Sequence, residues 1–232
     1  MNKISPQVLK YIFVSVASLE IVGHAFQFPE INQFTKPLLM PVLLLYFRNS
    51  LKSDVNLAFF IAMIALVFSW AGDVLLMYQA SGEIYFMLGL GAFSITQILY
   101  IIAFRKSTHE GQVSLTSFQR IVYLIPFIIF GAVLLNQLWP NAGELKLPLT
   151  VYASLLIAMV YSSILRTGST NVKSHNQVFF GALLFLFSDS LIAINKFLYP
   201  MDNPNLFIMM TYILAQWNIV KGLLLHYNEG HS

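Results

Sequence analysis

Long apolar stretches alternate with short polar connections along the whole 232-residue chain. A helix needs about 20 apolar residues to cross the hydrocarbon core of a bilayer. The connections contain residues that end helices, such as Ser81 with Gly82 and Pro140 with Asn141. The pattern predicts eight membrane-spanning helices, at residues 8–27, 33–48, 56–78, 83–104, 118–138, 147–166, 176–199 and 205–225.

The second of these segments, 33–48, differs from the others. It is short and contains Pro37 and Pro41. Proline removes a backbone hydrogen bond from a helix interior and bends or breaks the helix there. We therefore expect a segment that is kinked, tilted or partly re-entrant.

Composition supports this interpretation, because 57% of the residues are hydrophobic and 10% are charged. A soluble domain of this size cannot bury so much apolar surface. The expected fold is an all-α, polytopic bundle of about eight transmembrane helices, forming a single domain over residues 1–232. The chain has no cysteine, which excludes disulfides, thiolate nucleophiles and Cys-ligated metals. We expect no cofactor.

The basic residues predict the orientation, since cytoplasmic loops of membrane proteins are enriched in Lys and Arg. Ten of them fall on the side of the N-terminus and three on the other side. We expect an integral protein of a bacterial inner (plasma) membrane with both termini in the cytoplasm, and no nucleic-acid partner. The ten are Lys3, Lys10, Arg48, Lys52, Arg105, Lys106, Arg120, Arg166, Lys173 and Lys221, and the three are Lys36, Lys146 and Lys196.

Acidic residues lie inside several of the apolar segments. Asp189 stands within the run Gly181–Phe197, and Asp73 occupies a similar place in its own helix. A charged group at this depth costs a few kcal/mol and needs partners, water or a proton. With the predicted topology, Asp73, Asp189 and Glu20 all fall in the outer half of the membrane, and Lys36 can reach the same level. This is a match in depth and does not establish contact.

Small residues flank both aspartates. They permit another helix to approach, and their hydroxyl groups can orient a carboxylate or a water molecule. Two interpretations stay open, namely buried carboxyl groups that only tie helices together and a functional site that uses both. The flanking residues are Ser69 and Gly72 for Asp73, and Ser188 and Ser190 for Asp189.

A weak internal correspondence relates the two halves of the chain. Polar residues recur in the same order, as a 4+4 parallel repeat would require. Polar residues are few, so chance recurrence also explains the pattern. The pairs are Lys36 with Lys146, Asp73 with Asp189, and Gln97 with Gln216.

Several other catalytic devices lack support in the sequence. It contains no Gly-x-Ser-x-Gly nucleophile elbow and no Gly-rich phosphate loop. A zinc site at membrane depth needs several His ligands. Only His24 is placed inside the membrane, near the end of the first helix, where it is most simply an interfacial residue. The other histidines are placed in loops or the tail: His109, His175, His226 and His231.

A carboxylate pair remains, and it suits acid–base hydrolysis. One carboxyl group stays protonated in apolar surroundings and donates its proton, while the other stays ionised, stabilises positive charge and activates water. Ester hydrolysis would require a nucleophile and an oxyanion hole, which the sequence does not show. The residues therefore favour acetal, enol-ether or epoxide chemistry on a lipid.

Four stretches of the chain point to a known family: Lys36–Pro41, Ser69–Asp73, Phe86–Phe93 leading to Tyr100, and Gly181–Ser190 with Phe197. They resemble the YhhN family, which includes membrane lysoplasmalogenases, and the resemblance covers nearly the whole chain. Tyr212 and Gln216 also resemble the family's last-helix pattern. Family members often have His at the position of Gln97. If that His acts in catalysis in some relatives, its role is absent or altered here.

The resemblance implies an integral membrane hydrolase that cleaves the vinyl ether bond of a lysoplasmalogen, such as lysoplasmenylethanolamine or lysoplasmenylcholine. Asp73 and Asp189 would be the catalytic residues, and the partners would be a lysophospholipid and the bilayer. Two alternatives come from other classes. A proton-coupled secondary transporter would also place acids near the middle of the membrane, and a lipid-binding membrane protein would need the aspartates for stability alone.

Overall fold

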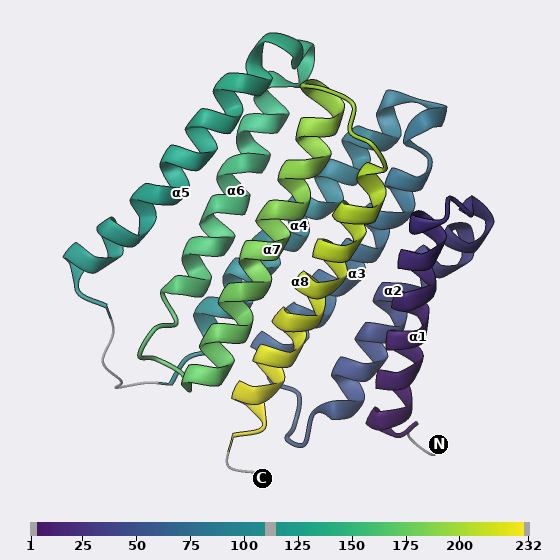
Figure 1. Ribbon diagram of the computed structural model, residues 1–232. Helices are drawn as coiled ribbons and strands as arrows, with labels where there is room; N and C mark the ends of the chain where they lie inside the picture. The colour runs from purple at the N-terminus through teal and green to yellow at the C-terminus, as the bar shows by residue number, and fades with distance from the viewer. Residues whose placement is uncertain (1–3, 110–114, 230–232) are drawn as a thin grey trace. The chain divides into compact units, whose positions relative to one another are not determined.

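The structure is a computed structural model that describes residues 4–109 and 115–229. Within these residues the regular structure is helical, with eight long α-helices and three short 3₁₀ turns (Figure 1). The α-helices are α1 (Pro6–Ala25), α2 (Pro29–Ser50), α3 (Leu57–Met77), α4 (Glu83–Lys106), α5 (Ser117–Leu138), α6 (Lys146–Ile164), α7 (Val172–Phe197) and α8 (Pro204–Tyr227). The 3₁₀ turns are η1 (Gln79–Ser81), η2 (Trp139–Asn141) and η3 (Gly143–Leu145).

The predicted polytopic all-α membrane fold is confirmed. Each of the eight predicted segments coincides with one long helix to within a few residues at either end. Among the described residues, seven helices are long and apolar enough to cross a membrane; α2 does not meet this standard. That α2 spans the membrane therefore stays a prediction.

Helix α2 is continuous through both of its prolines, so a re-entrant segment is not what the structure shows. Pro41 has no N–H group to bond the carbonyl of Pro37 one turn earlier. The indole N–H of Trp70 on α3 donates to that carbonyl instead, at 3.0 Å. The tryptophan thus satisfies a polar group that the second proline leaves open.

Side chains fix the first turns of several helices. The side chain of Asn56 accepts from the backbone N–H of Phe59 at 2.8 Å, and that of Asn171 accepts from the backbone N–H of Ser174 at 2.7 Å. Thr116 and Gln119 form a reciprocal capping box at the start of α5. Each cap satisfies a backbone donor that the first turn of a helix leaves without an intrahelical partner.

The chain divides into two compact units. The first runs up to Ala103 and includes the chain from Tyr227 onward, and the second is Phe104–His226. The boundary falls in the last turn of α4, so the first unit contains α1–α3 and most of α4, and the second contains α5–α7 and nearly all of α8. The polar pairs noted above fall in α2 and α6, α3 and α7, and α4 and α8. The repeat and the single domain over residues 1–232 stay predictions.

Close contacts of small residues and aromatic rings hold the first unit together. On α3, a Cβ at Gly72 would lie 2.7 Å from the ring of Phe93 on α4, so the close helix approach predicted at this glycine is confirmed. Between α2 and α3, the rings of Phe47 and Phe59 lie 4.1 Å apart. A larger residue at position 72 would therefore require the ring of Phe93 to move.

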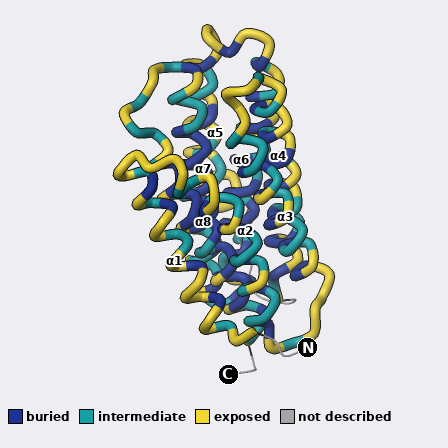
Figure 2. Tube along the Cα trace, turned by 90° about the vertical axis from the view of Figure 1, so that its right-hand side faces the viewer, coloured by how far each residue is buried: buried dark blue, intermediate teal, exposed yellow. Residues whose placement is uncertain are grey.

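The second unit packs α7 closely on α8. A Cβ at Gly181 would lie 2.8 Å from the carbonyl oxygen of Ala215, and one at Gly222 would lie 2.6 Å from the side chain of Val178. Helix α5 is different, because only Gly131 and Leu138 are buried along it. Figure 2 shows buried and exposed residues alternating along the helices. The exposed apolar surface of α5 suits contact with lipid.

Two histidine placements need correction. The first turn of α7 contains His175, and the last turn of α8 contains His226, whereas both were expected in connections. Both helices extend beyond the apolar runs that predicted them. Each ring is near a threonine hydroxyl, at 3.3 Å from Thr167 and 3.0 Å from Thr170 respectively. His231 lies outside the described residues.

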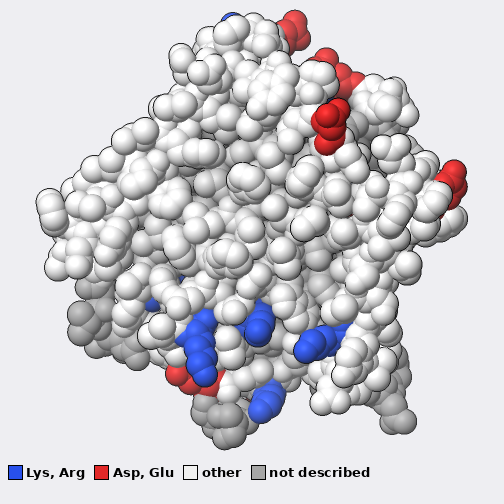
Figure 3. All heavy atoms as spheres, in the orientation of Figure 1, with Lys and Arg blue, Asp and Glu red and all other residues white. Residues whose placement is uncertain are grey.

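Charge is unevenly distributed between the two ends of the second unit. In the view of Figure 3, most basic side chains lie in the lower part, and acidic side chains lie in the upper part and also beside the lower basic groups. One end contains Arg120, Lys173 and Lys221, and the other contains Lys146 and Lys196. Lys3, which also entered the count, lies outside the described residues.

This asymmetry supports an orientation with both termini in the cytoplasm, which we propose. Reporter fusions after Ser107 and Asn171 should then report a cytoplasmic location, and a fusion after Asn141 an external one. An external signal at Ser107 would reverse the proposed topology.

Candidate active site

Asp189 lies on α7, eight residues before the helix ends at Phe197, and its residue is 5% exposed. The phenolic hydroxyl of Tyr152 on α6 donates a hydrogen bond to its carboxylate. Because Tyr152 is also buried, the two groups form a polar pair within apolar helices. No pattern in the sequence indicated Tyr152.

The pair lines a small, partly open cleft between α5, α6 and α7. Tyr152, Asp189 and Ser190 are its polar lining side chains. The other lining residues are apolar: Phe130, Gly131, Leu134, Leu135, Leu138, Leu149, Ala153, Leu156, Ile157, Leu186 and Ala193. A carboxyl group in such a wall can act on a hydrophobic ligand that fills the cleft.

The serines beside Asp189 donate elsewhere. The hydroxyl of Ser188 donates to the carbonyl of Ile208 at 3.0 Å, and that of Ser190 donates to the carbonyl of Leu186 at 2.7 Å. The sequence suggested that these hydroxyl groups orient the Asp189 carboxylate. Their protons are instead donated to backbone carbonyls, so they do not orient it. Ser188 instead links α7 to α8.

Helix α8 contributes two buried residues that the sequence had singled out, Tyr212 and Gln216. The ring of Tyr212 meets the ring of Phe185 edge-on, with centroids 5.7 Å apart. Phe185 stands one turn before Asp189 on α7. The tyrosine thus supports the helix face that presents the carboxylate.

Asp73 lies in the first unit, on α3, and is 3% exposed. Ser69, one turn earlier, donates to the hydroxyl of Thr96 on α4 at 3.3 Å. Gln97 and Tyr100 of the same helix are fully buried. Helices α3 and α4 thus hold several buried polar side chains in the unit that contains Asp73. No pattern in the sequence indicated the contact of Thr96.

A third buried acid, Glu20, joins α1 to α2. It is fully buried, lies 3.0 Å from the ring nitrogen Nε2 of His24, and accepts a hydrogen bond from the hydroxyl of Thr35. Its backbone carbonyl accepts from Asn32 at 2.8 Å. His24 is thus part of a polar cluster in the last turn of α1, and its interfacial position stays a prediction.

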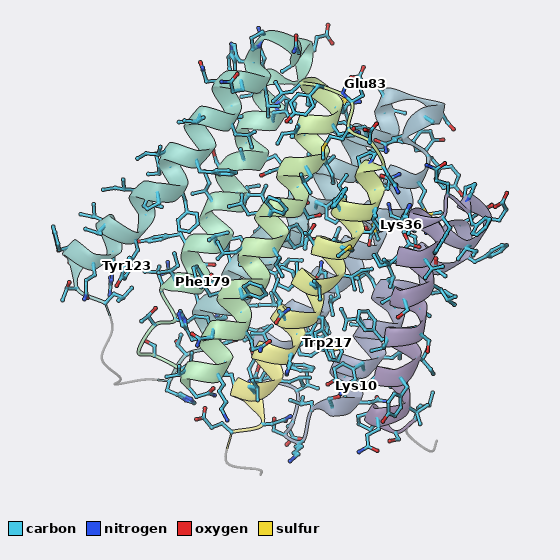
Figure 4. All side chains as sticks on the ribbon, viewed as in Figure 1. Lys10, Lys36, Glu83, Tyr123, Phe179 and Trp217 are labelled. Carbon is cyan, nitrogen blue, oxygen red and sulfur yellow. The ribbon has the colours of Figure 1, made fainter. Side chains whose placement is uncertain are left out.

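Lys36 follows directly after Thr35 in the chain. It is half-buried on α2, where Figure 4 labels it. A lysine at this position can extend its charged group toward a polar region while its alkyl stem covers apolar surface.

The two predicted catalytic acids therefore lie in different units, Asp73 in the first and Asp189 in the second. Each is buried and each has polar neighbours within its own unit. That they act together stays a prediction.

The fold and these buried acids define an integral, polytopic helical membrane protein with carboxyl groups inside its apolar helices. The YhhN family model matches residues 31–223. The chain belongs to the YhhN family.

Curated relatives are about 30% identical to the chain over the regions that align. The chain is 32% identical over 152 residues to "Lysoplasmalogenase TMEM86B" of Sus scrofa. The aligned region covers 66% of the chain and 58% of the relative. It is 32% identical over 160 residues to the protein of the same name in Homo sapiens, covering 69% and 62%. "Lysoplasmalogenase" of Mycobacterium tuberculosis is 30% identical over 139 residues, covering 59% and 50%.

The chain thus spans less than two thirds of the length of these relatives. No solved structure matches it.

Proposed function

We propose that the protein is an intramembrane hydrolase that cleaves the vinyl ether bond of a lysoplasmalogen, releasing a fatty aldehyde and a glycerophospho-base. Family membership and the names of the relatives support this reaction. The observation that carries the proposal is the buried carboxyl group of Asp189, bonded to a phenol in the wall of an apolar cleft. The carboxyl group of Asp189 can donate a proton from that wall to a vinyl ether that lies among apolar side chains.

The reaction begins with proton transfer from a carboxylic acid to the vinyl ether carbon further from the oxygen. This forms a C–H bond and leaves an oxocarbenium ion, which the second carboxylate stabilises and supplies with water. Water adds to the cationic carbon as the carboxylate takes its proton, giving a hemiacetal. The hemiacetal collapses to the aldehyde and the free glycerol hydroxyl, and one water molecule is consumed in all.

We assign the two acid–base roles to Asp73 and Asp189. Asp189 is the proposed acid, because it is the carboxyl group that lines the apolar cleft, where it can meet a hydrophobic substrate. The phenol of Tyr152 fixes the position of the carboxyl group. Asp73 is then the proposed group that remains ionised and activates water.

Lys36 is proposed either to bind the substrate phosphate or to keep one aspartate ionised. Lys36→Met should then raise KM or lower kcat by about tenfold or more, the value of one charge-assisted contact. Steady-state kinetics on purified protein measure both constants. Lys10→Met, an exposed lysine of α1, is the matched control. Wild-type kinetics in Lys36→Met would show that this side chain only extends to the membrane surface.

The function itself is tested with purified, detergent-solubilised protein and lysoplasmenylethanolamine. Release of a fatty aldehyde is the expected result, and the saturated alkyl ether analogue should remain intact because it cannot be protonated at carbon. Without aldehyde release the proposal fails, and a carrier would be indicated by proton-driven lipid movement into vesicles.

A further inference from the structure

We propose that His109 and His226 bind a divalent transition-metal ion, Zn²⁺ in the first place, at the end of the second unit where α7 begins and α8 ends. Both histidines belong to that unit. The start of α7 is about 25 Å along the helix from Asp189, so the proposed metal site is distinct from the candidate active site. It does not depend on the proposed function.

The two imidazole rings lie side by side. Their centroids are 4.7 Å apart and their planes are inclined by 43°. One nitrogen of each ring lies within 4.8 Å of one nitrogen of the other. Two nitrogens bound to the same Zn²⁺ at about 2.0–2.1 Å in a tetrahedral site are about 3.4 Å apart. Rotation of the side chains can close this difference, because neither histidine is buried.

One short segment holds both histidines. The backbone N–H of His109 donates to the carbonyl of Ser169 at 2.7 Å, and the ring nitrogen Nδ1 of His226 lies 3.0 Å from the hydroxyl of Thr170. Ser169 and Thr170 are consecutive, buried residues of the connection between α6 and α7. In Figure 1 the start of α7 and the end of α8 lie at the same, lower end. Residues far apart in sequence are thus held together by two neighbours.

Further hydrogen bonds fix the backbone beside each histidine. The guanidinium of Arg166 is fully buried and donates from Nε to the carbonyl of Ser107, two residues before the first histidine, at 3.2 Å. The side chain of Asn171 donates to the carbonyl of Leu225, the residue before the second, at 3.4 Å. A site built on a backbone that is already ordered loses less conformational freedom when it binds an ion.

The hydroxyl of Thr170 suits a metal-binding histidine. Such a histidine usually donates its second ring N–H to an oxygen atom, which fixes the tautomer and the ring orientation. When Nδ1–H of His226 donates to Thr170, the lone pair lies on Nε2, where a metal ion accepts it. Thr170 is therefore a positioning residue of the proposed site.

The donor set determines the class of ion. Imidazole nitrogens suit Zn²⁺, Cu²⁺ and Ni²⁺, whereas Mg²⁺ and Ca²⁺ prefer oxygen ligands. Zn²⁺ imposes no geometry of its own, so a pair of rings that must adjust can still bind it. Water molecules can complete the coordination, and the chain has a carboxylate three residues after His226, at Glu229.

The first test measures the Zn²⁺ affinity of purified, full-length, tag-free protein by competition with a chromophoric chelator. The wild type should bind Zn²⁺. Loss of an outer hydrogen bond costs roughly 10–100-fold in metal affinity, so Thr170→Val should weaken binding by about tenfold. His109→Ala and His226→Ala each remove a ligand and should weaken it by about 100-fold or more.

The matched control is His175→Ala, which removes another histidine ring from the first turn of α7 and should keep the wild-type affinity. Elution profiles should match that of the wild type. A wild type that does not bind Zn²⁺, or wild-type affinity in His109→Ala, His226→Ala or Thr170→Val, would overturn the proposal.

A spectroscopic measurement on the wild type tests the same site without any variant. The protein is loaded with less than one equivalent of Cu²⁺, and electron paramagnetic resonance detects the nitrogen atoms coupled to the copper. Coupling to two imidazole rings, with loss of the signal when Zn²⁺ displaces the copper, is the expected result. Coupling to one imidazole ring or to none would contradict the proposed pair.

Discussion

Asp189→Asn and Asp73→Asn are each expected to reduce lysoplasmalogen turnover by at least about 10²-fold, because positioned proton transfer contributes roughly 10²–10⁴ in rate. Asparagine keeps the volume of aspartate but cannot donate the proton or stabilise an oxocarbenium ion by charge. The amide oxygen at position 189 can still accept from Tyr152. The loss should therefore appear in kcat, measured as aldehyde released by purified protein.

Stability should not explain that loss. Replacing a buried charge by a neutral isostere leaves the fold intact or more stable. Thermal unfolding and elution profile should match those of the wild type. Asp54→Asn and Asp202→Asn alter exposed carboxylates of the first and second unit and serve as controls that retain activity. Wild-type turnover in either Asp73→Asn or Asp189→Asn would exclude the two-carboxylate mechanism.

Tyr152→Phe is expected to lower kcat by about tenfold, the value of one buried hydrogen bond that positions the acid. Tyr152 is a positioning residue, because it acts on the substrate through the Asp189 carboxyl group. The ring remains in the cleft wall, so KM should change little. The pH–rate profile should also change shape, since the phenol bonds one protonation state of the carboxyl group preferentially.

The matched control for this variant is Tyr161→Phe, which removes a phenolic hydroxyl from the same helix away from the cleft. It should retain wild-type kinetics. If Tyr152→Phe retained both kcat and pH profile, the hydrogen bond to Asp189 would have no part in the reaction.

The sequence was sufficient for the helices because bilayer thickness fixes their length and apolar composition marks them. It was less informative at α2, where Pro37 and Pro41 weaken the helix on local grounds. The structure retains a continuous helix there, with Trp70 of α3 bonded to the carbonyl of Pro37. That contact joins two helices, and local sequence patterns do not reveal such a partner.

The buried acids were also identifiable, since a carboxyl group in an apolar run is rare and costly. Their partners were not. Tyr152 lies six residues into α6 and Asp189 eight residues from the end of α7, about 9 and 12 Å from the same end of the unit. The sequence alone was therefore enough to place Tyr152 and Asp189 at a similar depth. Tyrosine is common in membrane helices, however, and only packing of α6 on α7 selects this one.

The serines beside Asp189 show that adjacency in sequence can suggest a hydrogen bond that the structure does not contain. Ser188 and Ser190 adjoin Asp189 in sequence, which suggested that their hydroxyls serve its carboxylate. Neighbouring residues on a helix point in different directions, and both hydroxyls donate to backbone carbonyls. Proximity along the chain was therefore a poor guide to the hydrogen-bond partners of the acid.

The central claim is that an enzyme carboxylic acid protonates the vinyl ether at carbon, and hydrolysis in heavy water tests it most directly. Purified protein is incubated with lysoplasmenylethanolamine in heavy water, and the aldehyde is trapped and analysed by mass spectrometry. The account predicts an aldehyde with a single deuterium on the carbon next to the carbonyl group. Release of an aldehyde without that deuterium, or no release of aldehyde, would contradict it.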